Sequence, residues 1–220
     1  MKKTGRREAL SRQRILETAL ALVDREGLEA VSMRRVGEEL GVEAMSLYNH
    51  VANKAAILDG IFEAVLAELP LPQPATTWQE MLRERAHALR STLRAHPNVL
   101  PLFSTRPAVT PASITHVEKA LDVLMAAGFS LRDAVSSFQV MFTFVVGHSI
   151  YSYRPVRPDE DASPTYERLS EADFPRMRAV ARMAQGRDPE EEFEFGLEAM
   201  FLGLAASLPS KRGKPRSPSP

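Results

Sequence analysis

The 220-residue chain contains no cysteine and a single tryptophan. The lack of cysteine excludes disulfide bonds, thiolate metal sites and cysteine nucleophiles, and it is typical of cytoplasmic proteins. Long hydrophobic runs are also missing, because the longest, residues 140–151, is interrupted by Thr143, Gly147 and His148. It is shorter than the roughly 20 apolar residues that span a bilayer, so we expect a buried helix and no membrane partner. Residues 1–10 are charged and lack the apolar core of a signal peptide, which also predicts a cytoplasmic protein.

The chain has no net charge, with 28 basic and 28 acidic residues, but these charges are unevenly distributed. Acidic residues gather at 188–194. Basic residues predominate near the start of the chain, at Lys2, Lys3, Arg6, Arg7, Arg12 and Arg14. A basic arm can attract nucleic-acid phosphates, but a solubilising tail has the same composition, and both interpretations stay open.

Apolar residues recur mostly at the helical period, and no stretch shows the sustained alternation of a β-strand. We therefore predict an all-α fold, with helices at about 11–26, 33–40, 44–50, 53–69, 76–95, 111–127, 131–152, 171–184 and 189–208. Pro70, Pro72 and Pro74 mark the best domain boundary. The predicted parts are a disordered basic arm (1–10), an N-terminal head (11–69), a C-terminal helical bundle body (75–208) with a surface loop at 154–170, and a disordered tail (209–220).

Residues 31–54 contain two short predicted helices separated by Gly41. A glycine here permits the backbone reversal of a helix-turn-helix unit, so we predict a three-helix head of this kind. The spacing directs Val36, Leu40 and Leu47 to a shared core. The outer face, where a recognition helix contacts base edges and its neighbours contact phosphates, carries Arg34, Ala44, Met45, Ser46 and Tyr48.

Residues 11–69 resemble the DNA-binding domain of the tetracycline-repressor (TetR) family of bacterial regulators. Two segments carry the resemblance: Arg-Arg-Val-Gly-Glu-Glu-Leu-Gly-Val at 34–42 and Leu-Tyr-x-His-Val-x-Asn-Lys at 47–54. It implies a repressor that binds double-stranded DNA, at a near-palindromic operator. By resemblance, the base contacts come from Arg34, Ala44 and Met45, and the phosphate or sugar contacts from Ser46, Tyr48, His50 and Lys54. Two alternatives stay open, in which the Tyr48 ring fills the core of the head and His50 is a solvent-facing helix end.

The body resembles, less strongly, the C-terminal domain of the tetracycline repressors themselves. The matching stretches are Trp-Gln-Glu-Met-Leu-Arg at 78–83, Ser-Thr-Arg-Pro at 104–107 and Gly-Phe-Ser-Leu-Arg-Asp at 128–133. Where those repressors hold the drug and its magnesium ion, this chain has Pro70, Arg85, Leu89, Leu102 and Tyr151. Leucine and proline side chains offer Mg²⁺ no oxygen ligand, so the resemblance implies a different inducer, with no metal and no cofactor.

A small hydrophobic molecule is the expected effector, because the predicted body helices carry many apolar and aromatic side chains. The candidate pocket residues are Arg85, Leu89, Leu102, Phe103, Phe144, His148 and Tyr151. Alternatively, the methionines and phenylalanines are plain core and His148 is a hydrogen-bonded buried residue. A bound effector would favour a separation of the two heads that does not fit the operator.

The predicted last helix, 189–208, carries an apolar stripe at helical spacing, with glycines that allow close approach. Its residues are Phe193, Leu197, Phe201, Leu204 and Leu208. Together with helix 131–152, we expect it to form the four-helix interface of a homodimer. A two-fold dimer would place its recognition helices in successive major grooves of the operator.

An enzyme is disfavoured by the motifs. Glu84-x-x-His87 has the spacing of a di-iron ligand pair, but no other histidine has a glutamate three residues before it. The chain also has no Gly-rich phosphate loop and no nucleophile elbow, so we predict no catalytic residue. The remaining alternative is a helical protein-interaction module that does not bind DNA.

Overall fold

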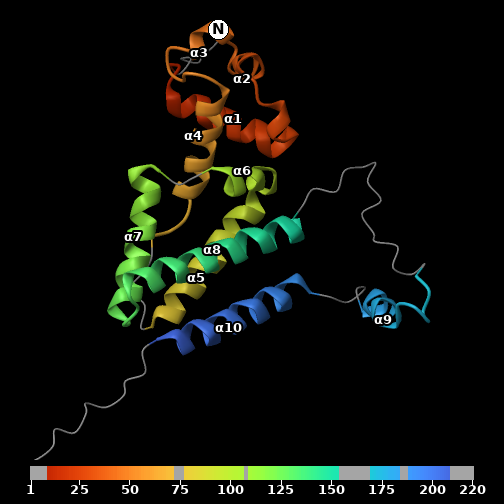
Figure 1. The fold of residues 1–220 in the computed structure, drawn as a ribbon. Coiled ribbons are helices and arrows are strands. Elements are labelled where there is room, and N and C mark those ends of the chain that lie inside the picture. Colours follow the sequence, from red (N-terminus) through yellow and green to blue (C-terminus); the bar gives the residue numbers. More distant parts are fainter. Residues whose placement is uncertain (1–8, 72–76, 107–108, 154–168, 184–187, 209–220) are drawn as a thin grey trace, which may run out of the picture.

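The computed structural model describes residues 9–71, 77–106, 109–153, 169–183 and 188–208, and every regular element in them is a helix (Figure 1). The predicted all-α fold is confirmed. The predicted basic arm, the loop at 154–170 and the tail at 209–220 lie almost entirely outside the described residues.

The head consists of α1 (Arg12–Glu26), α2 (Met33–Leu40), α3 (Ala44–Leu47) and the start of α4 (Lys54–Ala67). Ser11, Ser32 and Asn53 cap α1, α2 and α4, each accepting a hydrogen bond from the backbone N–H three residues later. The core between these helices is fully buried and includes Ile15, Leu22, Val36, Leu47, Ile57 and Ile61. Burial of these side chains fixes the orientation of α2 and α3 on α1 and α4.

The body contains α5 (Trp78–Ala95), α6 (Leu100–Thr105), α7 (Pro111–Ala126), α8 (Leu131–Tyr153), α9 (Pro175–Met183) and α10 (Pro189–Ser207). Figure 1 shows α4 running from the head down to the body, where it meets α6 and α7. Below this junction α8 packs against both α5 and α10. Helix α4 therefore belongs to the cores of both parts.

Ionic contacts fasten α10 to α5. Nη1 of Arg83 lies 2.8 Å from a carboxylate oxygen of Glu194, and Nε2 of His87 lies 2.9 Å from its other oxygen. Arg90 pairs with Glu190, and its guanidinium carbon lies 4.3 Å from the ring centre of Phe193. Part of the acidic cluster noted in the sequence thus neutralises a basic face of α5.

The expectation that the Phe193 stripe of α10 faces a partner subunit is wrong for the first three of its five residues. Its first three residues are buried within the protomer: Phe193, Leu197 and Phe201. Phe193 stacks on Phe144 of α8 with ring centres 5.4 Å apart. A Cβ atom on Gly196 would lie 2.3 Å from Cζ of Phe144, so this glycine accommodates a helix of its own chain. The large apolar residues of α10 that are exposed are instead Phe195 and Leu202.

Further differences from the predicted helices concern short elements. Helix α6 and the 3₁₀ helix η2 (Pro97–Val99) were not predicted, because prolines usually end helices. Pro97 and Pro101 lie in first turns, where no backbone N–H is required. Helix α3 ends at Leu47, and turn residues rather than helix complete the predicted segment 44–50.

Helix α8 is long and apolar enough to cross a membrane, by length and composition alone. It packs against α5, α6, α7 and α10, and central helices of soluble proteins pass the same test. These contacts bury part of its apolar surface, including Met141 and Val145, whereas Val140 and Ile150 are exposed.

Candidate functional site

Two glycines shape the helix-turn-helix unit. Gly41 ends α2 in the left-handed region, with φ of 67°, and lets the chain reverse into α3. The N–H of Val42 donates to the carbonyl of Gly37 at 2.9 Å. A Cβ atom on Gly37 would lie 2.9 Å from the carbonyl oxygen of Val42 and 3.2 Å from the nitrogen of Ala44. The start of α3 therefore packs directly on the backbone of α2.

The residues expected to contact DNA lie on this unit. Met45 on α3 and Arg34 on α2 are exposed, and Ala44 and Ser46 are partly buried. His50 is exposed in the turn after α3, and Lys54 is exposed as the first residue of α4. Tyr48 is 49% exposed, so its ring does not fill the core of the head. The residues expected to contact DNA are thus exposed or only partly buried, and none of them belongs to the buried core of the head.

Neighbouring arginines on α2 have different surroundings. Arg35 pairs with Glu26 at the end of α1 at 2.9 Å and with Glu39 at 2.7 Å. The side chain of Arg34 is exposed, and its Nε lies 3.2 Å from Glu38 one turn along the same helix. An exposed pair of this kind stabilises little, so Arg34 can be redirected to another anion at small cost. Arg35 instead holds α2 on α1.

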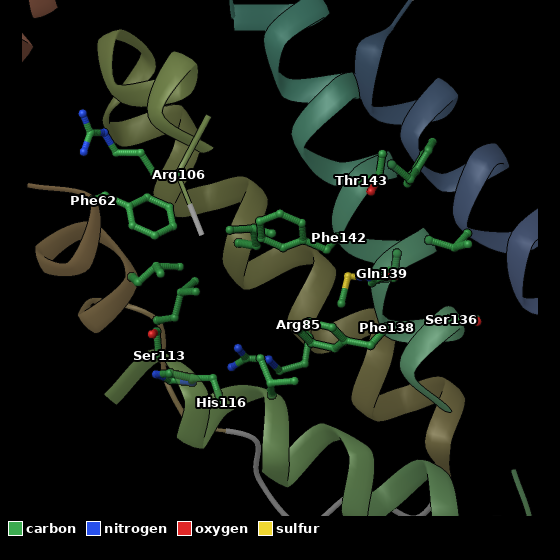
Figure 2. Close-up of a pocket in the computed structure, with 17 residues that line it drawn as sticks. Phe62, Arg85, Arg106, Ser113, His116, Ser136, Phe138, Gln139, Phe142 and Thr143 are labelled. Carbon is green, nitrogen blue, oxygen red and sulfur yellow. The ribbon is translucent and has the colours of Figure 1, made fainter. Parts of the chain in front are cut away.

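The body contains a cavity of about 870 Å³ between α4, α5, α7 and α8, within the usual size range of small-molecule sites (Figure 2). Most of its wall is apolar. It is lined by Phe62, Leu66, Leu69, Arg85, Leu89, Arg106, Ser113, His116, Val117, Ser136, Phe138, Gln139, Val140, Met141, Phe142, Thr143 and Phe144.

Only some of the expected pocket residues line this cavity, namely Arg85, Leu89 and Phe144. Leu102 and Phe103 are buried on α6, where Phe103 packs edge-on against the lining residue Phe62 at 5.0 Å between ring centres. His148 faces α10 instead, with Nδ1 3.2 Å from the hydroxyl of Ser152 and its ring against Phe193. Tyr151 is 79% exposed and lies outside the cavity.

Sequence reasoning missed the polar groups that α7 and α6 bring to the cavity. These are Ser113 and His116 on α7 and Arg106 at the end of α6. Ser113 and His116 are three residues apart, a spacing that places both on one face of a helix. That spacing was the available signal, but α7 has other polar residues at helical spacing, so the sequence alone does not select this pair.

Arg85 and His116 form the polar end of the cavity. In Figure 2 the guanidinium of Arg85 extends toward the ring of His116, with Ser113 beside them. Nη1 of Arg85 donates to the carbonyl of Pro70 at 2.6 Å. Burial lowers the pKa of Arg85. Burial also lowers the pKa of His116, and the neighbouring charges of Arg85 and Lys119 lower it further.

Two family models match the chain. The model of the bacterial regulatory proteins of the TetR family matches residues 15–61, and that of the tetracyclin repressor-like C-terminal domain matches residues 71–208. The chain belongs to the TetR family. As a member of this family, the protein is a DNA-binding transcriptional regulator, as the head predicted.

Two relatives and one solved structure illustrate the similarity. The TetR-family chain is 32% identical over 214 residues to the tetracycline repressor protein class E of Escherichia coli, covering 94% of this chain and 96% of that protein. It is 30% identical over 211 residues to an HTH-type transcriptional regulator of Saccharopolyspora erythraea, covering 94% and 89%. The crystal structure of the Streptomyces coelicolor TetR family protein ActR in complex with actinorhodin matches with a TM-score of 0.78 and 30% identity, covering 90% of this chain and 98% of that one.

Contacts from the cavity wall reach α4 of this TetR-family regulator. Phe62 and Leu66 on α4 line the cavity directly. The hydroxyl of Ser113 donates to Glu63 on α4 at 3.4 Å, and Arg106 at the end of α6 pairs with Asp59. Helix α4 begins at Lys54 beside the helix-turn-helix unit, so one rigid element joins the cavity to the head.

The lining of the cavity in this TetR-family member holds basic and neutral side chains. Leu89, Arg85 and His116 are among the side chains that it presents, and none supplies a carboxylate. Across the residues that the structure describes, no group of three histidine, aspartate or glutamate side chains is placed to hold a metal ion.

Proposed function

We propose that this regulator is a cytoplasmic homodimeric repressor, which binds a near-palindromic operator and leaves it when a small hydrophobic effector occupies the body cavity. In this proposal residues 11–69 are the DNA-binding domain and residues 75–208 bind the effector and form the dimer. The observation that carries the proposal is that α4 is shared by both, because it begins at the helix-turn-helix unit and lines the cavity.

The proposed base contacts come from Arg34, Ala44 and Met45. Arg34 can donate two hydrogen bonds to a guanine edge, whereas Ala44 and Met45 offer apolar contact to a thymine methyl. The proposed phosphate and sugar contacts come from Ser46, Tyr48, His50 and Lys54. The exposure of Lys54 in the first turn of α4 supports this role, because the free amides there also favour an anion.

Effector binding is proposed to act through α4. A molecule that fills the cavity presses on Phe62 and Leu66 and alters the polar contacts of Glu63 and Asp59. A shift of α4 would move the head relative to the body and change the distance between the recognition helices of a dimer. This requires the effector to bind the shifted state more tightly than the operator-bound state.

An aromatic effector has support from a relative. ActR, which is similar over most of this chain, has been crystallised in complex with actinorhodin. Phe62, Phe138 and Phe142 line the cavity of the present protein, and aromatic walls suit a flat ring system.

The dimer is proposed to form through the outward faces of α8 and α10. Phe195 and Leu202 on α10 are 77% and 72% exposed, and Ile150 and Tyr151 add apolar surface on α8. Exposed apolar side chains gathered on neighbouring helices are typical of an interface that a second subunit covers.

The test is fluorescence anisotropy with DNA from the region upstream of the chain's own coding sequence, against shuffled DNA of equal length. We expect a sequence-specific complex at moderate salt, with affinity falling by about 10³-fold or more between 50 and 200 mM salt if at least six phosphates are contacted. Actinorhodin is the first effector probe and is expected to dissociate the complex. If neither the upstream DNA nor a selected random-sequence pool yields a specific complex, the protein-interaction module becomes the better interpretation.

A further inference from the structure

The cavity contains a buried cation that no acidic side chain neutralises within the described part of the chain. Arg85 is 7% exposed, and among the described residues its side chain donates a hydrogen bond to the carbonyl of Pro70. Its buried Nε has no hydrogen-bond partner among the residues that the structure describes. Arg90, five residues later on α5, is also buried, and its Nε likewise has no partner among the described residues, but its Nη1 pairs with Glu190 and its guanidinium lies over Phe193. The difference between these two arginines is the missing anion at Arg85.

A second unpartnered polar group lies at the same end of the cavity. His116 is 8% exposed, and within the described ranges its buried Nδ1 has no hydrogen-bond partner. Arg85 and Lys119 both act on His116 as positive charges. The nearby carboxylate of Glu63 is bonded to Thr110 and Ser113. This end of the cavity therefore presents unused hydrogen-bonding capacity in a positive field.

An unpaired buried charge is expensive, and leaving a buried donor unsatisfied costs free energy that a ligand can recover. The group that recovers most of it at a guanidinium is an ionised acid, because its oxygens accept charge-assisted hydrogen bonds. Away from Arg85 the cavity wall is mainly apolar, with residues such as Phe62, Met141 and Phe142, although Arg106, Ser136, Gln139 and Thr143 also line it. A complementary ligand has an aromatic body with an acid group at one end.

We propose that the effector is an aromatic acid, whose ionised carboxylate or sulfonate is bound by Arg85 and His116 while its rings lie among the apolar side chains of α4 and α8. This inference rests on the proposed function of the cavity as the effector site. It adds the chemical class of the effector and the residues that select it.

The experiment compares two fluorescent probes on the full-length protein. Anilinonaphthalene sulfonate carries an acid group, and N-phenylnaphthylamine has the same rings without it. We expect the wild-type protein to bind the sulfonate more tightly. Arg85→Met should weaken sulfonate binding by about 10- to 100-fold, the range for a hydrogen bond to a charged group, and leave the neutral probe within about twofold. Arg132→Met, which removes an exposed arginine of α8, is the matched control and should change neither affinity.

Three measurements separate this role from a structural one. Arg85→Met should retain or raise the melting temperature of the unliganded protein, because it removes an uncompensated buried charge. Val117→Trp places a large ring in the cavity and should abolish binding of both probes. Naphthoate should displace the sulfonate probe at lower concentration than naphthamide, and this difference should disappear in Arg85→Met.

The inference is overturned if Arg85→Met keeps the wild-type preference for the sulfonate, or if naphthoate and naphthamide compete equally in the wild-type protein. Retained sulfonate binding in Val117→Trp would place the anion elsewhere and would overturn it as well. Operator binding without either probe tests the proposed function separately. If the protein binds DNA specifically but Arg85→Met keeps the wild-type probe preference, the inference of an aromatic acid is rejected and the proposed function is kept.

Discussion

Nδ1 of His96, which follows α5, lies 2.9 Å from Oδ2 of Asp24 on α1, so a polar contact joins the body to the head. Nε2 of the same ring lies 3.1 Å from Glu68 at the end of α4. Asn98 reinforces the junction by donating to the carbonyls of Val23 and Asp24. The ring thus bridges α1, the end of α4 and the end of α5, so a movement of the head against the body would act on this junction.

This junction predicts a pH dependence of stability. Burial lowers the pKa of His96, but the carboxylates of Asp24 and Glu68 outweigh it, so the pKa is raised overall. A raised pKa contributes stability that is present in full below the unfolded value of about 6.5 and is lost as pH rises through the folded value. We expect His96→Asn to destabilise the protein by about 1 kcal/mol or less at pH 6 and by less at pH 8, because both carboxylates are partly exposed.

Urea unfolding of the wild-type protein and the His96→Asn variant across this pH range measures the effect. The quantity to compare is the difference between the two plots of unfolding free energy against pH. The pKa values of His116 and His148 are lowered, so these residues change the stability of both proteins with pH in the direction opposite to His96. His50→Asn, at an exposed position, is the control. A wild-type-minus-variant difference that does not change with pH would contradict the role of His96.

Replacing Arg34 and replacing Lys54 should lower operator affinity in two different ways. Arg34→Ala should weaken specific binding by about 1–3 kcal/mol and relax the preference at one base position, because a base contact is removed. Lys54→Ala should weaken binding to all sequences alike and lower the slope of log affinity against log salt by about one. Arg132→Ala in the body is the control for loss of a basic charge. Unchanged affinity and slope in both head variants would remove these residues from the interface.

The head was predictable from sequence because its signals are local. Gly41, the caps Ser32 and Asn53, and the buried residues Val36 and Leu47 act on neighbours a few positions away. The role of Arg35 was not predictable in the same way. Its partner Glu26 comes from another helix, so the contrast with Arg34 arises only when α1 and α2 pack.

The cavity was less predictable for the same physical reason. Arg85 was expected there, but His116 becomes its neighbour through the packing of α7 on α5. Tyr151 was expected in the pocket, and yet the rotation of α8 turns it outward. The apolar stripe that begins at Phe193 was expected to contact a partner subunit, whereas Phe193 packs on Phe144 of α8 in the same protomer.

Gly37 predicts that the contact between α2 and α3 tolerates no side chain. Gly37→Ala places a Cβ atom against the carbonyl oxygen of Val42 and the nitrogen of Ala44, which are backbone atoms that cannot turn aside. We expect a loss of about 1–3 kcal/mol in stability, as for other overpacked sites, together with weaker operator binding because α3 is displaced. Thermal unfolding and anisotropy measure the two effects. Wild-type values for both would show that the turn relaxes without cost.

The outward face of α10 predicts the oligomeric state. Phe195→Asp and Leu202→Asp each place a charge in the centre of the proposed interface, and two-fold symmetry introduces it twice. We expect either variant to raise the dimer dissociation constant by about 100-fold or more, measured by sedimentation, with the helical content unchanged. Phe174→Asp, at an exposed phenylalanine preceding α9, is the matched control and should stay dimeric. Because each head alone spans one half-site, the monomeric variants should also lose operator affinity at low protein concentration. Dimers that withstand both substitutions would exclude this face as the interface.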